Sequence, residues 1–135
     1  IEKDAANYFW PGSLTLIVKK KKNNLFYGDK RTQRIGLRIP NHPVVLELLK
    51  KVSFFLASTS ANIHGENNVN DLKKLKILKN KKIAFGIESK HCLSFEESTI
   101  IEISQQSVKI LRQGLISKIE IKKFLKKFNF EKEIV

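Results

Sequence analysis

Residues that can hold a polar ligand without titrating lie near the middle of the chain, where Ser60 and Asn62 follow the uncharged, mostly apolar residues 52–57. The apolar run predicts a buried strand, and the small polar residues after it predict a loop at its carboxyl end. Ser60 and Asn62 are two positions apart, so they face the same side of an extended chain. Their hydroxyl and carboxamide can hydrogen-bond a ligand, although an ordinary Ser/Asn turn explains the same residues.

Two arginines share one side of a second candidate strand, residues 34–40. Alternation places its apolar residues on one face and Arg34, Gly36 and Arg38 on the other. The glycine between the arginines leaves room for something to lie against the strand. A guanidinium can pair with a carboxylate as a fork, whereas the alternative for Arg38 is a solvated cation on an edge strand.

Periodicity and boundary residues predict the elements that would position these side chains. Further strands are expected at residues 13–18, 82–87, 97–103 and 107–112, the last two as a hairpin. Helices are expected at residues 1–9, from an N-cap at Asn41 to about Lys51, from Asn70 or Asp71 to about Leu78, and after a capping box at Ser117 and Glu120. The second of these helices is expected to bury Val44, Leu48 and Val52. Strands and helices mixed in this order predict an α/β sheet with helices packed on it.

Composition fits one globular domain, with 135 residues of which 41% are hydrophobic and 29% charged. The 26 basic and 13 acidic side chains give a net charge of +13, which indicates attraction to polyanions such as RNA or nucleotides. Most of the basic residues are lysines in tracts. A solvated lysine-rich surface therefore explains the charge as well as a nucleic-acid site does.

The cysteine count and the hydropathy of the sequence indicate in which cellular compartment the protein would act. Cys92 is the single cysteine, which rules out an intrachain disulfide and favours a reducing cytoplasm. His91 beside it would point to the opposite face of a strand, so we assign the pair no nucleophilic or metal-binding role. The apolar runs are too short for a transmembrane helix, and no membrane partner is expected. Because the chain contains no Met and opens in apparent helix, we expect its N-terminal part to be missing.

Five short motifs, in order along the chain, closely resemble those of the threonylcarbamoyl-AMP synthase family, the YrdC-like domain. They are Phe-Trp-Pro-Gly-Ser-Leu-Thr (residues 9–15), Gly-Leu-Arg-Ile-Pro-Asn-His-Pro (36–43), Ser-Thr-Ser-Ala-Asn (58–62), Glu-Ser-Thr (97–99) and Leu-Arg-Gln-Gly (111–114). Each motif is weak alone, but together they are specific and span most of the chain. The resemblance implies a twisted mixed α/β sheet, with residues 1–135 as the C-terminal portion of a single YrdC-like domain.

The resemblance also implies an activity. L-threonine, bicarbonate and ATP would react to threonylcarbamoyl-adenylate and pyrophosphate, a nucleotidyl transfer that serves N6-threonylcarbamoyladenosine formation at position 37 of tRNA. Mg²⁺ would accompany ATP, and tRNA, other double-stranded RNA or the tRNA threonylcarbamoyl-transfer machinery would be further partners. The family's N-terminal cations are absent here, so we expect these 135 residues alone to be inactive.

Site residues follow from the match to the family motifs, and none of them is assigned as catalytic or as a metal ligand. Those expected to bind L-threonine are Arg38, Ser60 and Ser98. Those expected to bind ATP are Asn62, Arg112, Asn70 and Arg34, although the family commonly has a threonine in place of Asn70 and a small hydroxyl residue in place of Arg34. The turn at residues 10–12 and Thr15 are interpreted as structural. We expect Arg38, Ser60, Asn62, Ser98 and Arg112 to converge on one concave face.

Two other functions compete with this one. A basic module of the same fold could bind structured RNA without chemistry, but such a binder typically interleaves aromatic residues or arginines on an exposed face. The other competing function is a sister activity of the same fold with a different acyl acceptor, such as formation of a carbamoyl-adenylate. Uncharged Ser60, Asn62 and Ser98 beside Arg38 favour a small-ligand site over an RNA-binding surface.

Overall fold

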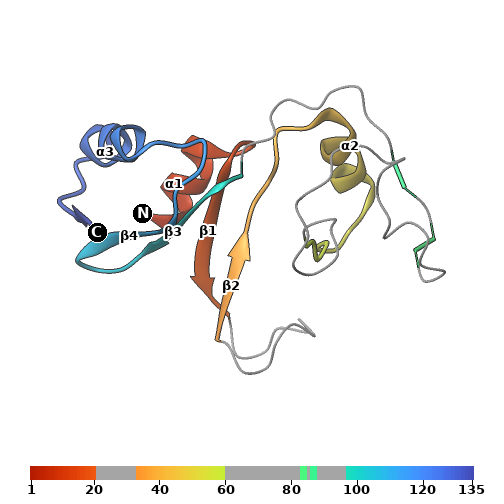
Figure 1. Cartoon of the computed structure of the whole chain (residues 1–135), viewed down its shortest axis with the longest axis horizontal. Helices are drawn as coiled ribbons and strands as arrows, with labels where there is room; N and C mark the ends of the chain where they lie inside the picture. The colour runs from red at the N-terminus through yellow and green to blue at the C-terminus, as the bar shows by residue number, and fades with distance from the viewer. Residues whose placement is uncertain (21–32, 60–82, 85, 88–96) are drawn as a thin grey trace. The chain divides into compact units, whose positions relative to one another are not determined.

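The computed structural model describes residues 1–20, 33–59, 83–84, 86–87 and 97–135 (Figure 1). The chain divides into two compact units, the first made of Ile1–Asn41 with Glu96–Val135 and the second of His42–Phe95. The organisation of all 135 residues as part of a single domain stays a prediction.

A mixed sheet of five strands in the order β2-β1-β3-β4-β5 forms the first unit. The strands are β1 (Leu14–Lys19), β2 (Arg34–Leu37), β3 (Thr99–Ile103), β4 (Ser107–Arg112) and β5 (Glu133–Ile134). β1 runs antiparallel to β2 and parallel to β3, while β3 and β4 form the expected antiparallel hairpin. β5 pairs in parallel with β4 and was not predicted. The mixed α/β sheet itself confirms the predicted fold class.

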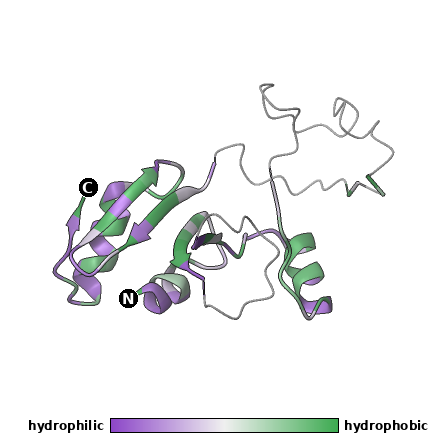
Figure 2. Cartoon of the chain, turned by 90° about the horizontal axis from the view of Figure 1, so that it is seen from below, coloured by the Kyte–Doolittle hydropathy of each residue, from purple (hydrophilic) through white to green (hydrophobic). Residues whose placement is uncertain are grey.

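One face of this sheet carries the core, because apolar residues alternate along its central strands. Leu14 and Leu16 of β1 and Ile101 of β3 are at most 2% exposed. Helices α1 (Glu2–Phe9) and α3 (Lys118–Lys127) pack on the same face (Figure 1). Figure 2 shows their hydrophobic and hydrophilic residues alternating, as expected for helices with one buried side. The helices contribute Ala5, Ile121, Phe124 and Leu125 to the core.

The other face of the sheet, here called the polar face, carries side chains of a different kind. Register places on it Thr15, Ile17 and Lys19 of β1, Arg34 and Gly36 of β2, and Ile100 and Glu102 of β3. A Cβ added to Gly36 would lie 3.3 Å from the Thr15 side chain and 3.4 Å from that of Ile17. This contact, together with the ion pair between Arg34 and Glu102, confirms that Arg34 and Gly36 share a side of their strand.

A β-bulge in β4 decides which way Arg112 points. Ile101 pairs with Ile110, but the neighbouring Ile100 pairs with Arg112, so Leu111 is the extra residue. In regular alternation Arg112 would face the core together with Ile110. The bulge instead places Arg112 opposite Ile100, on the polar face.

The closing helix begins as predicted. The Ser117 hydroxyl accepts a hydrogen bond from the Glu120 backbone N–H at 3.2 Å, and the Glu120 carboxylate accepts one from the Ser117 N–H at 2.8 Å. These hydrogen bonds from Ser117 hold the pKa of Glu120 below its usual range. Ser117 and Glu120 therefore form the capping box that the sequence predicted.

The second unit contains α2 (Pro43–Lys51), which confirms the predicted helix. Its N-cap is His42 rather than Asn41, because Pro43 occupies the first helical position and its fixed φ leaves the preceding residue as the cap. No residue of α2 is buried, and Leu48 is 39% exposed. The predicted buried stripe of this helix is therefore wrong.

The strand predicted at residues 52–57 is also wrong. This segment is not a strand, and Phe54 and Phe55 are exposed. A strand needs a neighbour to pair its backbone groups, and the described part of the second unit contains none. Residues 83, 84, 86 and 87 are likewise not in a strand. The helix expected at residues 70–78, as well as His91 and Cys92, lie outside the described residues.

Candidate functional site

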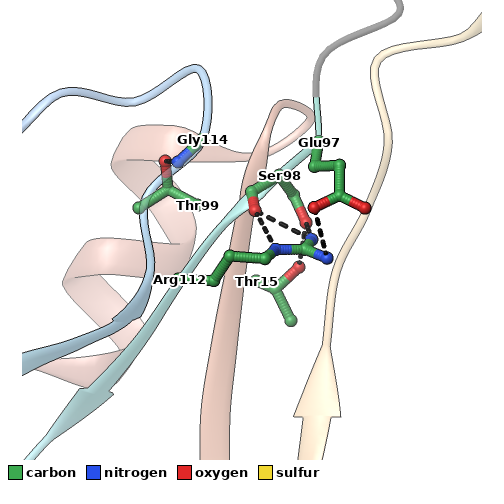
Figure 3. A network of polar contacts seen from close by, with 6 residues as sticks. All are labelled: Thr15, Glu97, Ser98, Thr99, Arg112 and Gly114. Atoms are coloured by element: carbon green, nitrogen blue, oxygen red, sulfur yellow. Dashed lines mark hydrogen bonds and ion pairs between the residues drawn. The ribbon is translucent and has the colours of Figure 1, made fainter.

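A network of polar contacts centres on Ser98, directly before β3 (Figure 3). Ser98 is only 6% exposed, and its Oγ lies 2.8 Å from the Oγ1 of Thr15 on the neighbouring strand. The parallel pairing of β1 with β3 brings these two residues together at one end of the sheet. The network therefore joins residues that are 83 positions apart in the sequence.

Arg112 binds the other side of Ser98. Its Nε and Nη2 donate to the Ser98 carbonyl at 3.1 and 2.9 Å, and Nη2 also donates to the Ser98 Oγ at 3.0 Å. Nη1 forms an ion pair with the Glu97 carboxylate at 3.0 Å. A guanidinium has five N–H groups, so a second N–H of Nη1 is not used by these contacts.

Thr99 and Gly114 link the strand of Ser98 to the segment that follows Arg112 (Figure 3). The Gly114 N–H donates to the Thr99 Oγ1 at 3.0 Å, and this hydroxyl donates to the Ile116 carbonyl at 2.7 Å. A Cβ added to Gly114 would collide with the backbone of residues 97–99. The motifs at residues 97–99 and 111–114 thus form one packed unit that fixes the end of β3.

Arg38 is held by the turn that precedes β1. Its Nε donates to the Gly12 carbonyl at 2.8 Å, while the Gly12 N–H donates to the carbonyl of Ile39 at 2.8 Å. Partial burial and the nearby Arg112 guanidinium lower the pKa of Arg38 from its usual value. No acidic residue in the part of the chain that the structure describes forms an ion pair with Arg38. The interpretation of the turn as structural agrees with these contacts.

Arg34 lies at the opposite end of β2 and forms an ion pair with Glu102 of β3. Four residues of extended chain separate it from Arg38 by roughly 13 Å. Together with Lys19 and Lys132, it lines a cavity of about 900 Å³ at that end of the sheet. The structure therefore does not bring Arg34 to the network around Ser98.

Three of the five residues expected to converge on one face, Arg38, Ser98 and Arg112, lie near one another. Arg38 and Arg112 are close enough to influence each other electrostatically, and Arg112 contacts Ser98 directly. Ser60, Asn62 and Asn70 lie outside the described residues, so their part in a common site stays a prediction. The ligands assigned to all seven residues also stay predictions.

Sequence reasoning did not identify two members of this network, Glu97 and Thr15. Glu97 belongs to one of the motifs but was assigned no role. Its position beside Ser98 and its ion pair with Arg112 become visible only when β3 and β4 are aligned. For Thr15 a signal existed. It stands between the buried residues Leu14 and Leu16, so alternation already placed its hydroxyl on the other face of β1.

Comparison with known proteins gives a consistent result. The model of a family that groups Sua5, YciO and YrdC proteins, described as "Telomere recombination", matches residues 2–114. A provisional threonylcarbamoyl-AMP synthase of Methanocaldococcus jannaschii is 33% identical over 116 residues, which are 86% of this chain and 54% of that protein. The threonylcarbamoyl-AMP synthase of Bacillus subtilis is 28% identical over 84% of this chain and 33% of its own length.

A solved structure shares the fold. The crystal structure of P. abyssi Sua5 complexed with L-threonine matches with a TM-score of 0.77 and 26% identity, over 99% of this chain and 38% of that one. The chain thus spans about half, or less, of the length of the relatives that it matches. With a family model covering most of its residues and the same fold in a solved relative, the chain belongs to the Sua5/YciO/YrdC family.

Proposed function

We propose that the protein is an L-threonylcarbamoyladenylate synthase, which converts L-threonine, bicarbonate and ATP to threonylcarbamoyl-AMP and pyrophosphate. The product would supply N6-threonylcarbamoyladenosine at position 37 of tRNA. The observation that carries this proposal is the match, over 99% of the chain, to a Sua5 structure complexed with L-threonine. The names of the sequence relatives support the same reaction.

L-threonine would bind between Arg38 and Ser98. The Nε of Arg38 is anchored on the Gly12 carbonyl, so its two terminal nitrogens can meet a carboxylate as a fork. Two guanidinium groups that repel each other favour an anion between or beside them, since it offsets part of that repulsion. The Ser98 hydroxyl would hydrogen-bond the amino acid. Ser60 is expected to bind the amino acid as well, by its match to the family motif.

ATP would lie on the side of Arg112. The Nη1 N–H that is not used inside the network can donate to a phosphate oxygen or to the base. Negative charge develops on pyrophosphate as it leaves, and fixed cations stabilise that charge. Asn62 and Asn70 would contact the nucleotide as well. Arg34, which the family match also assigns to the nucleotide, is ion-paired with Glu102 at the other end of β2.

Mg²⁺ is expected to accompany ATP, because this ion is usually bound through substrate phosphates with few protein ligands. The described residues do not gather three or more His, Cys, Asp or Glu side chains into a metal-binding group. Glu97, the carboxylate in the network, is paired with Arg112.

The proposed function implies a cellular location and macromolecular partners for the protein. Among the helices that the structure describes, none combines the length and the apolar character needed to cross a bilayer. A cytoplasmic site of action and contact with tRNA or with the threonylcarbamoyl-transfer machinery are proposed on the strength of the family alone.

Pyrophosphate release tests the proposed function. The protein as encoded, with whatever residues flank these 135, is incubated with ATP, Mg²⁺, bicarbonate and L-threonine, and each substrate is omitted in turn. Release is expected only in the complete mixture, together with a product of the mass of threonylcarbamoyl-AMP. Release that continues without L-threonine would refute the proposal, and a different amino acid that supports it better would redirect it to a sister activity.

A further inference from the structure

Thr15 was not expected to act in binding, yet it makes the shortest contact to the Ser98 hydroxyl. The two oxygens are 2.8 Å apart, with Thr15 on β1 and Ser98 beside it at the start of β3 (Figure 3). Ser98 is nearly inaccessible to solvent, so water cannot freely replace a lost partner. Thr15 therefore influences how the Ser98 hydroxyl can be used.

The hydrogen-bonding capacity of Ser98 limits the possible arrangements. A serine hydroxyl has one O–H donor and two acceptor lone pairs. Arg112 can only donate, so its bond of 3.0 Å takes one lone pair of the Ser98 Oγ. One O–H and one lone pair remain, and Thr15 uses whichever of them a ligand does not.

Thr15 can take either role because its own hydroxyl both donates and accepts. When a ligand oxygen accepts from Ser98, Thr15 donates to the free lone pair of Ser98. When a ligand N–H donates to Ser98, Thr15 accepts the Ser98 O–H. In both cases the Ser98 hydroxyl is fully bonded and keeps one hydrogen-bonding group, either its O–H or a lone pair, for the ligand.

We infer that Thr15 is a positioning residue for L-threonine, acting through the hydroxyl of Ser98 rather than by touching the substrate. The inference rests on the proposed function, in which Ser98 binds the amino acid. It assigns Thr15 a role in substrate affinity, beyond the structural role indicated by its place in β1. No ATP contact is assigned to the hydroxyl of Thr15 or of Ser98, so the KM for ATP is expected to stay unchanged.

Kinetics of Thr15→Val test the inference, because valine keeps the shape of threonine and removes the hydroxyl. In the protein as encoded, the KM for L-threonine is expected to rise roughly two- to tenfold, the effect of one hydrogen bond. The KM for ATP should stay unchanged, and Thr15→Ser should restore the wild-type KM for L-threonine. Thr15→Ala serves the same comparison if the valine variant does not fold.

Ile17→Val is the matched control, since Ile17 lies on the same face of the same strand. It should change the thermal midpoint without changing either KM. A purely structural role for Thr15 would give the same pattern in Thr15→Val. Unchanged affinity for L-threonine in Thr15→Val, with the wild type active, would therefore overturn the inference.

A double-mutant cycle with Ser98→Ala shows whether the effect passes through Ser98. In the Ser98→Ala background, Thr15→Val should raise the KM for L-threonine by less than about twofold. A full additional effect would overturn the inference, because Thr15 would then act independently of Ser98. A wild-type protein with no release dependent on L-threonine would instead overturn the proposed function, and this inference with it.

Discussion

Arg112 uses most of its hydrogen-bonding groups within the chain. Three contacts bind it to the carbonyl and hydroxyl of Ser98, and a fourth joins it to Glu97. A buried carbonyl that loses its donors is costly, because water cannot replace them. Arg112 therefore stabilises the strand end that carries Ser98, in addition to any contact with a ligand.

Arg112→Lys should lower the free energy of unfolding by about 1–3 kcal/mol, because an ammonium on a flexible stem cannot reproduce the forked contact to Ser98. Urea denaturation measures this change. Arg34→Lys is the matched control on the same face of the sheet. Its ion pair with Glu102 involves an Arg34 side chain that is 56% exposed, so a loss below about 1 kcal/mol is expected. Equal losses in the two variants would contradict the role assigned to Arg112.

At the scale of elements, two segments far apart in sequence fix the candidate site by packing against each other. Residues 97–99 enter β3, and residues 112–114 leave β4 beside them. Gly114 lies so close to the Glu97 carbonyl and the backbone after it that no side chain fits. The glycine of the last motif is therefore needed for close approach of two backbones.

Gly114→Ala should lower the free energy of unfolding by about 1–3 kcal/mol, because the added methyl group forces the two segments apart. Thermal unfolding of this variant is compared with that of Gly36→Ala. At Gly36 the added carbon meets only side chains, at 3.3 and 3.4 Å, so the control should lose less. A Gly114→Ala protein as stable as the wild type would show that the segments are not packed as described.

Local signals predicted the three helices that the structure describes and the hairpin, whereas features that depend on a neighbour were missed. The capping box of Ser117 needs only four consecutive residues, and it formed as expected. Regular alternation could not reveal the bulge at Leu111, which turns Arg112 to the polar face. Residues 52–57 were apolar enough for a buried strand, but apolar composition does not provide a pairing partner. Of the candidate site, Ser98 and Arg112 came from the family motifs, whereas strand alternation had also singled out Arg38.

At the scale of the whole molecule, the net charge of +13 is the property that favours an RNA-binding module instead of an enzyme. The basic side chains of the network, Arg38 and Arg112, contact backbone carbonyls and a carboxylate. Arginines held in this way are suited to a small ligand. Any attraction to RNA is therefore expected to come mainly from the many lysine side chains.

RNA binding should accordingly be weak, independent of sequence and strongly dependent on salt, because counterion release drives it. Fluorescence anisotropy with a labelled RNA hairpin is expected to show association at about 0.05 M salt that falls by orders of magnitude near 0.2 M. A hairpin of unrelated sequence serves as the control. Binding that discriminates between the two hairpins at the higher salt would favour the RNA-binding module.

The claim that Arg38 and Ser98 form an L-threonine site is tested most directly by the two KM values of Arg38→Ala. A lost charged pair with the substrate carboxylate should raise the KM for L-threonine roughly 10- to 100-fold. The KM for ATP should change by less than about threefold, since no ATP contact is assigned to Arg38. Equal increases in both KM values, or a KM for L-threonine that does not change, would contradict the account and place the amino-acid site elsewhere.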